Sequence, residues 1–454
     1  MSDEFDVVLE QVRERVEPDD EERAALQAAT DTLVERTEDA LEDLPVDGEV
    51  LLVGSAARET WLAGDRDIDI FVSFPPDLER EQLRSYGLEV GHTVLPDGTE
   101  EFAEHPYVVG EYEGFDVDIV PCYAVESASD IKSAVDRTPF HARYVTDRLT
   151  PDLASDVRVT KQFLTGIGIY GSNLKTRGFS GFLTELLVLE YGGFRELVTA
   201  AADWDLPVRL DPEGHGTTTF EDDLVVIDPT DPERNVAAVL STANLGRFIH
   251  FARDILDQPR LDLFETPDRD PLDADTVRER FRERNTTPVA LTFDAPDIVD
   301  DQLWPQLDRS LSGIADELQR RGFDIFRTDR FVSDGEAMLL FELAVAQRPA
   351  LERHTGPPVH VRIHAESFYE AYADGDATGP FIYEDRYVVE RPREFTTARE
   401  FLESDKLFDV ALGANVESAL ETGYTLAIGD DIATLADTFG EQFVRYLSPT
   451  PRRN

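Results

Sequence analysis

The stretch Val53–Phe71, VGSAARETWLAGDRDIDIF, constrains the fold of this chain more than any other segment. Its pattern is that of a strand end, a tight turn at Gly54-Ser55, a short helix over about 56–62 and a second strand from Asp67. A helix that starts directly after such a turn presents free backbone N–H groups and the positive end of its dipole, which attract a phosphate. The turn is therefore a candidate phosphate site.

The second strand carries two acidic residues at alternating positions, Asp67 and Asp69. Alternate residues of a strand point to the same face, so the two carboxylates are predicted side by side, about 7 Å apart, with Ile68 and Ile70 towards the core. Two carboxylates on one rigid face repel each other unless a cation lies between them. Mg²⁺ prefers such oxygen ligands and leaves positions open for substrate phosphates. Together with the turn, this pattern predicts phosphoryl or nucleotidyl transfer.

A third carboxylate is predicted on a neighbouring strand. Strands Val108–Tyr112 and Phe115–Val120 flank a Glu113-Gly114 turn, which is a hairpin signal, and the second strand carries Asp118. Three carboxylates on adjoining strands can hold two Mg²⁺ ions about 3.5–4 Å apart. The alternative is that they are ordinary surface acids, because the chain has 94 acidic residues. The Gly54-Ser55 turn upstream and the strand with Asp118 downstream favour the interpretation of these carboxylates as a metal site.

The composition indicates a globular, cytoplasmic protein. With 454 residues and 41% hydrophobic side chains, the chain is long enough for several domains with sizeable cores. No apolar run approaches the length of a membrane span, and the acidic N-terminus lacks the apolar core of a signal peptide. A single cysteine, Cys122, rules out an intramolecular disulfide and suits a reducing cytoplasm.

The net charge of −51 would by itself argue against a polyanionic partner. However, only four of the 43 basic residues are lysine, and the acidic residues are spread over every segment. That pattern is typical of cytoplasms that hold molar salt, where a Debye length of about 3 Å leaves only close contacts effective. The charge thus indicates a salt-loving organism and does not exclude nucleic acid as a partner.

The order of predicted elements indicates an α+β fold in three parts. Residues 1–140 are predicted to form a mixed sheet with packed helices, and residues 141–270 are predicted to be mainly helical. An acidic, proline-bearing stretch over 257–286 is the best candidate boundary. Residues 271–454 then begin with a strand–helix–strand–strand order, which suits a small α/β RNA-binding module.

The motifs resemble the nucleotidyltransferase superfamily typified by DNA polymerase β, and more closely the archaeal (class I) CCA-adding enzymes, which are tRNA nucleotidyltransferases. The resemblance rests on GSAARETWLAGDRDIDIF, VDIVPCY and four further segments in family order, Ala134–His141, Val159–Leu187, Ile227–Ala238 and Arg353–Val359. It implies a nucleotidyltransferase palm over 1–140, a central domain over 141–270 that completes the nucleotide pocket, and a tail and body region over 271–454 that binds tRNA.

The resemblance implies template-independent addition of C, C and A to the 3′ end of tRNA from CTP and ATP, with Mg²⁺ as cofactor and release of pyrophosphate. One alternative is a poly(A) polymerase or oligoadenylate synthetase of the same superfamily. Another is a non-catalytic RNA-binding relative. Relatives are often dimers, and the sequence leaves open whether this chain forms a homodimer. No membrane partner is expected.

Carried over by position, the resemblance assigns metal binding and catalysis to Asp67, Asp69 and Asp118, with Asp118 nearest the attacking 3′-hydroxyl. It assigns nucleotide binding to a further set, Gly54, Ser55, Arg58, His141, Lys161, Tyr170 and Arg234. Arg234 would read the Watson–Crick edge of the incoming base, because its fork of donors suits acceptors on both C and A. Contacts to tRNA are expected from Ser55, Arg58, Lys175 and Arg177.

Several of these residues also have a purely structural alternative. His141 could be a loop histidine with satisfied hydrogen bonds, Lys161 a surface lysine in mid-helix, and Arg234 a cap of the following helix. For Lys161 the functional interpretation is favoured, because the chain has only four lysines. Tail arginines such as Arg321 and Arg330 could contact phosphates or could pair with the acids nearby.

Overall fold

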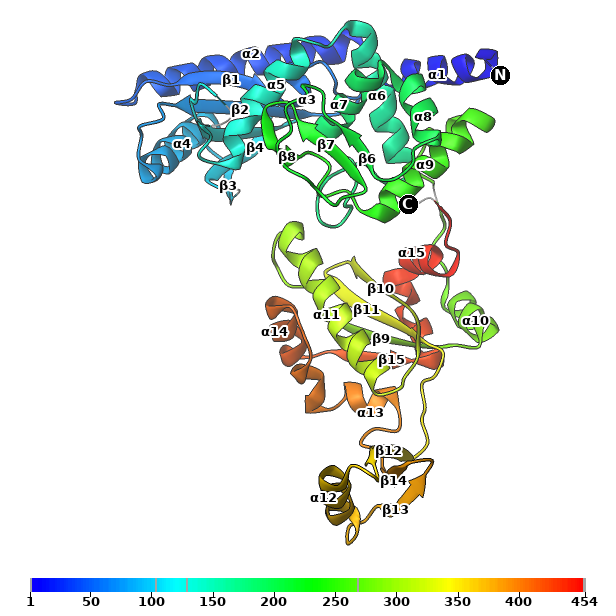
Figure 1. Cartoon of the computed structure of the whole chain (residues 1–454). Coiled ribbons are helices and arrows are strands. Elements are labelled where there is room, and N and C mark those ends of the chain that lie inside the picture. Colours follow the sequence, from blue (N-terminus) through cyan, green and yellow to red (C-terminus); the bar gives the residue numbers. More distant parts are fainter. Residues whose placement is uncertain (1, 103, 128–129, 268, 452–454) are drawn as a thin grey trace. The chain divides into compact units, whose positions relative to one another are not determined.

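The structure of the chain is a computed structural model, and it describes residues 2–102, 104–127, 130–267 and 269–451. The chain divides into two compact units, residues 1–268 with 451–454 and residues 269–450, whose elements are labelled in Figure 1. No helix in the described ranges is both long and apolar enough to cross a membrane.

The first unit combines a five-stranded and a three-stranded sheet with flanking helices. Its helices are α1 (Ser2–Val16), α2 (Asp20–Glu42), α3 (Gly54–Ala57), α4 (Arg80–Val94), α5 (Thr138–Thr146), α6 (Pro151–Gly166), α7 (Gly181–Tyr191), α8 (Phe194–Ala202) and α9 (Thr242–Asp257), with 3₁₀ turns η2 (Ala134–Arg137) and η3 (Leu261–Phe264). Its strands are β1 (Glu49–Val53), β2 (Asp67–Phe74), β3 (Thr99–Phe102), β4 (Pro106–Tyr112), β5 (Phe115–Tyr123), β6 (Val208–Leu210), β7 (Leu224–Asp228) and β8 (Asp231–Asn235).

The five-stranded sheet, which we call the palm sheet, has the order β1-β2-β5-β4-β3. In this sheet β2 and β5 run parallel and the other neighbours are antiparallel. Its core side is lined by Ile68 and Ile70 of β2 and by Val117 and Ile119 of β5, all at most 1% exposed. These residues share one core with Leu33 of α2. The predicted mixed sheet and the predicted inward direction of the two isoleucines are confirmed.

The turn after β1 differs from the prediction. The helix expected over about 56–62 is limited to α3, and Glu59 adopts a positive φ of 54°. Thr60 lies in the interior instead, where its carbonyl accepts a hydrogen bond from the side chain of Lys161 rather than from a following helical N–H. A single helical turn has only a small dipole, so the predicted phosphate site must depend on side chains as well as on backbone N–H groups.

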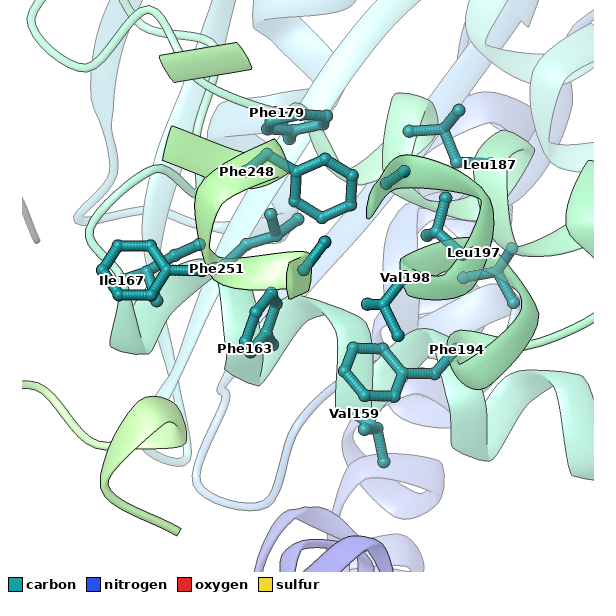
Figure 2. Packing of buried hydrophobic residues seen from close by; sticks show 14 of the residues in the cluster. Val159, Phe163, Ile167, Phe179, Leu187, Phe194, Leu197, Val198, Phe248 and Phe251 are labelled. Atoms are coloured by element: carbon teal, nitrogen blue, oxygen red, sulfur yellow. The ribbon is translucent and has the colours of Figure 1, made fainter. Parts of the chain in front are cut away.

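Helices α6, α7, α8 and α9 enclose one apolar core (Figure 2). The ring centroids of Phe163 on α6 and Phe194 on α8 are 5.4 Å apart, and those of Phe179 and Phe248 are 4.9 Å apart. All four rings are fully buried. Burial of a side chain of this size stabilises the fold by about 1.5–3 kcal/mol. This packing fixes the positions of α6 and α7, which carry the polar groups described below.

The second unit contains a four-stranded sheet of order β10-β11-β9-β15 and a three-stranded sheet of order β12-β14-β13. Its helices are α10 (Ala274–Arg284), α11 (Asp300–Arg320), α12 (Arg362–Tyr372), α13 (Ala398–Leu402), α14 (Ala414–Thr422) and α15 (Ala436–Leu447), with 3₁₀ turns η4 (Asp405–Asp409) and η5 (Gly429–Leu435). Its strands are β9 (Thr287–Asp294), β10 (Ile325–Ser333), β11 (Glu336–Leu343), β12 (Leu351–Pro358), β13 (Thr378–Tyr383), β14 (Arg386–Pro392) and β15 (Thr425–Ile428).

The strand–helix–strand–strand order predicted for the tail is confirmed by β9, α11, β10 and β11. The strands β3, β6, β8 and β12 to β15 were not predicted. Several of them lack an apolar alternation because they lie at an edge or in an open sheet. For example, β3 is exposed along its whole length, and only Gly356 is buried in β12.

The two ends of the second unit lie together. The chain enters this unit at Arg269 and leaves it at Thr450, and the Arg269 guanidinium donates a hydrogen bond to the Thr450 hydroxyl at 3.0 Å. Pro451 belongs again to the first unit, where its carbonyl accepts a hydrogen bond from Arg247 of α9 at 3.0 Å. The second unit is therefore inserted between two points of the first.

Candidate active site

The carboxylates predicted on two strands are neighbours in the palm sheet. Strands β2 and β5 pair in parallel, with Asp69 opposite Asp118 and Asp67 opposite Asp116. Residues paired in this way point to the same face of a sheet, and the isoleucines and valines that alternate with them fill the other face. Four carboxylates therefore form two adjacent rungs on the face that points away from α2. Asp116 was not among the predicted site residues.

Burial and mutual repulsion raise the pKa of all three predicted carboxyl groups. The pKa of Asp118 rises to about 6, first through burial and then through the charges of Asp69 and Glu101. For Asp69, burial and the charge of Asp67 raise the pKa, and the charge of Arg58 opposes the rise. The pKa of Asp67 is also raised, again chiefly by burial. A cation bound among these groups would relieve the repulsion.

The chemistry of this donor set suits Mg²⁺. The candidate ligands are carboxylate oxygens, and Mg²⁺ typically binds one or two carboxylates and completes its shell with water and substrate phosphates. Among the residues that the structure describes, no group of three or more His, Cys, Asp or Glu side chains is arranged to hold a metal ion by itself. The chain thus offers an open set of oxygen ligands, and the three-carboxylate metal site stays a prediction.

Gly54 is required by the close approach of the first turn to β2. The antiparallel register of β1 and β2 places Val53 opposite Asp69, so the next residue passes over the Asp69 side chain. Gly54 has a φ of +70°, and a Cβ atom there would lie 1.8 Å from Oδ2 of Asp69. Only glycine fits at this position, and the half-buried Ser55 follows it directly. The turn, which the sequence predicted as a candidate phosphate site, therefore lies against the Asp69 carboxylate.

A buried network joins Arg58 to the helical region. Nε of Arg58 donates to Oε1 of Glu185 on α7 at 2.9 Å, and the hydroxyl of Thr60 donates to the same oxygen at 2.7 Å. Nζ of Lys161 on α6 donates to the carbonyl of Thr60 at 2.8 Å. Thr60 and Glu185 are fully buried, and the Arg58 side chain is 10% exposed. Two predicted nucleotide-binding cations thus share one network, which we call the Thr60 network.

Lys161 is buried, and Tyr170 is half-buried against the helical core. Lys161 is 3% exposed, and its burial lowers its pKa to about 8, while the charge of Glu185 opposes that change. Burial, followed by the charge of Glu185, raises the pKa of Tyr170 well above its ordinary value. The alternative interpretation of Lys161 as a surface lysine is therefore wrong.

His141 and Arg234 come together through Asp228, at the end of β7. Nε2 of His141 and a terminal nitrogen of Arg234 lie 2.8 and 2.7 Å from Oδ2 of Asp228. The other oxygen of Asp228 accepts two hydrogen bonds from Thr230 at 2.9 and 2.8 Å. Although burial opposes the change, the hydrogen bonds and charge of His141 hold the pKa of Asp228 well below its usual range. The His141 ring also stacks on Phe182, with centroids 3.9 Å apart.

The loop over residues 171–178, which we call the basic loop, exposes Lys175 and Arg177. Residues 176 and 177 of this loop are hydrogen-bonded to the start of α9. The side chain of Asn244, which is fully buried, donates to the carbonyls of Thr176 and Arg177 at 2.7 and 2.9 Å. The N–H of Ser241 donates to the Arg177 carbonyl at 2.9 Å. The loop thus holds two solvent-facing cations on a fixed backbone, where a phosphate can approach them.

Arg321 and Arg330, two of the tail arginines named from the sequence, pair with acids. Arg321 contacts Glu317 at 2.6 Å and Glu394 at 2.7 Å. Arg330 contacts Asp308 at 2.6 Å. For these two residues the pairing alternative is confirmed.

Sequence reasoning missed the groups that connect the predicted residues, namely Thr60, Phe182, Glu185 and Asp228. Glu185 is the acidic residue in the apolar run FLTELLVL, and Asp228 directly follows the apolar strand residues LVVI. An acidic residue inside an apolar segment was the available signal, because a buried charge is costly unless it is paired.

Three family models match successive parts of the chain. They are a nucleotidyltransferase domain over residues 34–141, the second domain of tRNA nucleotidyltransferase over 155–265, and the C-terminal domain of CCA-adding enzyme over 284–429. Among solved structures, Escherichia coli MS115-1 CdnC with ATP aligns with 57% of this chain and 94% of that chain, at 19% identity and a TM-score of 0.44.

Relatives with established names match over almost the full length. The CCA-adding enzyme of Haloarcula marismortui is 59% identical, and the match covers 99% of this chain and 100% of that protein. The CCA-adding enzyme of Halorubrum lacusprofundi is 57% identical with the same coverage. That of Methanosarcina barkeri is 40% identical over 94% of each chain. On this evidence, and in agreement with the motifs around the carboxylates, the chain belongs to the family of CCA-adding enzymes.

Proposed function

We propose that this chain adds C, C and A in turn to the 3′ end of tRNA, from CTP and ATP, without a nucleic-acid template, with release of pyrophosphate and in the cytoplasm. The observation that carries the proposal is the register of β2 and β5, which sets Asp69 beside Asp118 on the face away from the core. Asp67, one rung further along, is the third carboxylate. These three residues are the ones that would hold two Mg²⁺ ions.

Mg²⁺ bound at these carboxylates would lower the pKa of the attacking 3′-hydroxyl and neutralise charge on the triphosphate. The chain's own contribution is a rigid sheet that holds the oxygens in register, together with a nearby proton acceptor. We assign that acceptor to Asp118, the carboxylate that the family resemblance places nearest the attacking 3′-hydroxyl and that pairs with Asp69 across β2 and β5.

The remaining predicted residues hold the nucleotide. Arg58 and Lys161, the cations of the Thr60 network, bind the triphosphate through charge-assisted hydrogen bonds. Arg234 reads the base edge: Asp228 fixes one side of its guanidinium, while the side chain remains 37% exposed and keeps donors available. Contacts to the triphosphate or sugar are completed by Gly54, Ser55, His141 and Tyr170.

The basic loop is proposed to bind the acceptor end of tRNA through Lys175 and Arg177. Contacts to phosphates provide affinity without reading sequence, and RNA helices are recognised largely by shape. Such contacts suit an enzyme that must accept tRNAs of every sequence.

The test compares Asp118→Asn with Asp116→Asn, a matched control on the same strand and the same face, one rung away. The substrate is tRNA that lacks its CCA end, supplied with CTP, ATP and Mg²⁺. We expect Asp118→Asn to lose incorporation and keep tRNA binding, and Asp116→Asn to keep most of its activity. Full activity of Asp118→Asn would contradict the proposed site.

The same assay with the unsubstituted chain distinguishes CCA addition from the two alternative functions. Repeated addition of A alone to any RNA would indicate the poly(A) polymerase alternative. Binding of tRNA without incorporation would indicate the non-catalytic alternative.

A further inference from the structure

A buried carboxylate lies beneath the predicted phosphate site. Glu185 is fully buried on α7, and its Oε1 accepts from Arg58 at 2.9 Å and from Thr60 at 2.7 Å. Its second oxygen, Oε2, is also buried and makes no hydrogen bond to any described residue. A buried carboxylate oxygen without a partner is costly, so its retention requires an explanation.

The neighbouring charges supply that explanation. Arg58 and Lys161 lie in the same network, where the positive charge of Arg58 disfavours the charged form of Lys161 and the negative charge of Glu185 favours it. Glu185 lies in the interior on α7, where the next two residues, Leu186 and Leu187, are 2% and 1% exposed in the helical core. Glu185 is thus part of the helical core through α7. Its hydrogen-bond partners, Arg58 and Thr60, belong to the segment between α3 and β2.

We propose that Glu185 is a positioning residue of the nucleotide site, which holds the Nε side of the Arg58 guanidinium so that its two terminal nitrogens are directed to the triphosphate. A guanidinium is planar, and one hydrogen bond from Nε to a fixed carboxylate restricts the plane of the whole group. Thr60 assists by donating to the same carboxylate oxygen. The inference rests on the proposed function, in which Arg58 binds the triphosphate.

The second unit offers a matched control. Glu342 is also fully buried and also accepts from an arginine Nε and a threonine hydroxyl, those of Arg284 at 2.6 Å and Thr286 at 2.5 Å. Glu185→Gln should raise the KM for CTP and ATP about tenfold and leave the KM for tRNA unchanged, because the hydrogen bond from Arg58 loses its charge assistance. Glu342→Gln should change none of these values, while both variants lose thermal stability. An unchanged nucleotide KM in Glu185→Gln, or an equal rise in both variants, would overturn the inference.

A double-mutant cycle then tests whether Glu185 acts through Arg58. If it does, adding Glu185→Gln to Arg58→Gln should raise the nucleotide KM by less than about twofold further. Independent, multiplicative effects of the two substitutions would overturn the inference. If Arg58→Gln alone leaves the nucleotide KM unchanged, the proposed function of Arg58 fails, and that outcome is distinguishable because it does not involve Glu185.

A milder variant covers the case in which Glu185→Gln does not fold. Thr60→Val keeps both charges and removes the hydroxyl, which donates to Glu185 at 2.7 Å and accepts a longer hydrogen bond from Lys161 at 3.4 Å. We expect a rise of about two- to threefold in the nucleotide KM, because one neutral donor to a carboxylate contributes less than the guanidinium. A nucleotide KM equal to that of the parent chain would count against the inference.

Discussion

Replacing Asp228 by asparagine should destabilise the first unit by about 2–4 kcal/mol. Asp228 is fully buried, and its Oδ2 contacts both His141 of α5 and Arg234 of β8. Asparagine keeps one oxygen for the two hydrogen bonds from Thr230 but presents an amide group to the other two partners. The substitution therefore removes two charge-assisted contacts at almost constant volume.

The magnitude follows from the exposure of the two partners. A hydrogen bond to a charged group contributes about 1.5–3 kcal/mol, and this range applies to His141, whose side chain is 13% exposed. The Arg234 side chain is 37% exposed, so solvent screening limits its contribution to about 1 kcal/mol or less. The two contributions together give the expected loss.

Urea unfolding measures the loss, provided that the two units are distinguished. The three tryptophans are Trp61 and Trp204 in the first unit and Trp304 in the second, so a Trp304→Phe background restricts the fluorescence signal to the first unit. Glu213→Gln is the control, because it removes an ion pair with Arg148 in which both side chains are more than a third exposed. A loss in Asp228→Asn no larger than in this control would refute the reasoning.

The pH dependence of the difference has a defined sign. The folded-state pKa of Asp228 is depressed, so its stabilising contribution is fully present above the unfolded pKa of about 3.9 and is lost as the pH falls through the lower folded value. The difference in unfolding free energy between the parent and Asp228→Asn should therefore be constant from pH 7 to about pH 5. A difference that already disappears at pH 6 would contradict this account.

Three further outcomes are expected. Single-nucleotide addition should decline above about pH 8, where Lys161 loses its proton, and Lys161→Arg should move that decline to higher pH in a pH–rate profile. Gly54→Ala should abolish incorporation and lower thermal stability by more than Gly64→Ala, because both glycines have a positive φ but only at Gly54 would the new Cβ meet Asp69. If the acidity is an adaptation to salt, folding and activity should both require high KCl, and full activity in dilute buffer would contradict that interpretation.

The alternation Asp67-Ile68-Asp69-Ile70 was sufficient to predict which side of β2 carries the carboxylates, because burial of the isoleucines determines the face. The pairing of Asp69 with Asp118 could not be predicted in the same way. It depends on the register between two strands that are distant in sequence, and that register is set by the packing of the whole palm sheet, which no short motif contains.

Glu185 and Asp228 show a second limit of sequence reasoning. Their burial follows from the apolar residues around them, but their roles depend on partners from other elements, Arg58 and Thr60 in one case and His141 in the other. A hydrophobic pattern reports that a position is buried and does not report which charges will meet there. The helix predicted over about 56–62 is shorter in the structure for the same reason, because the Thr60 carbonyl accepts from the Lys161 side chain and not from a helical N–H.

Arg269 and Thr450 bring the entry and the exit of the second unit within one hydrogen bond of each other. A segment whose ends meet can be replaced by another segment with the same end-to-end distance, or by a short linker, without changing the path of the chain that receives it. Recombination can therefore exchange residues 269–450 as a single cassette while the palm sheet and the helical core keep their connectivity. In this architecture, the surface carried by the second unit and the chemistry of the first can change separately in evolution.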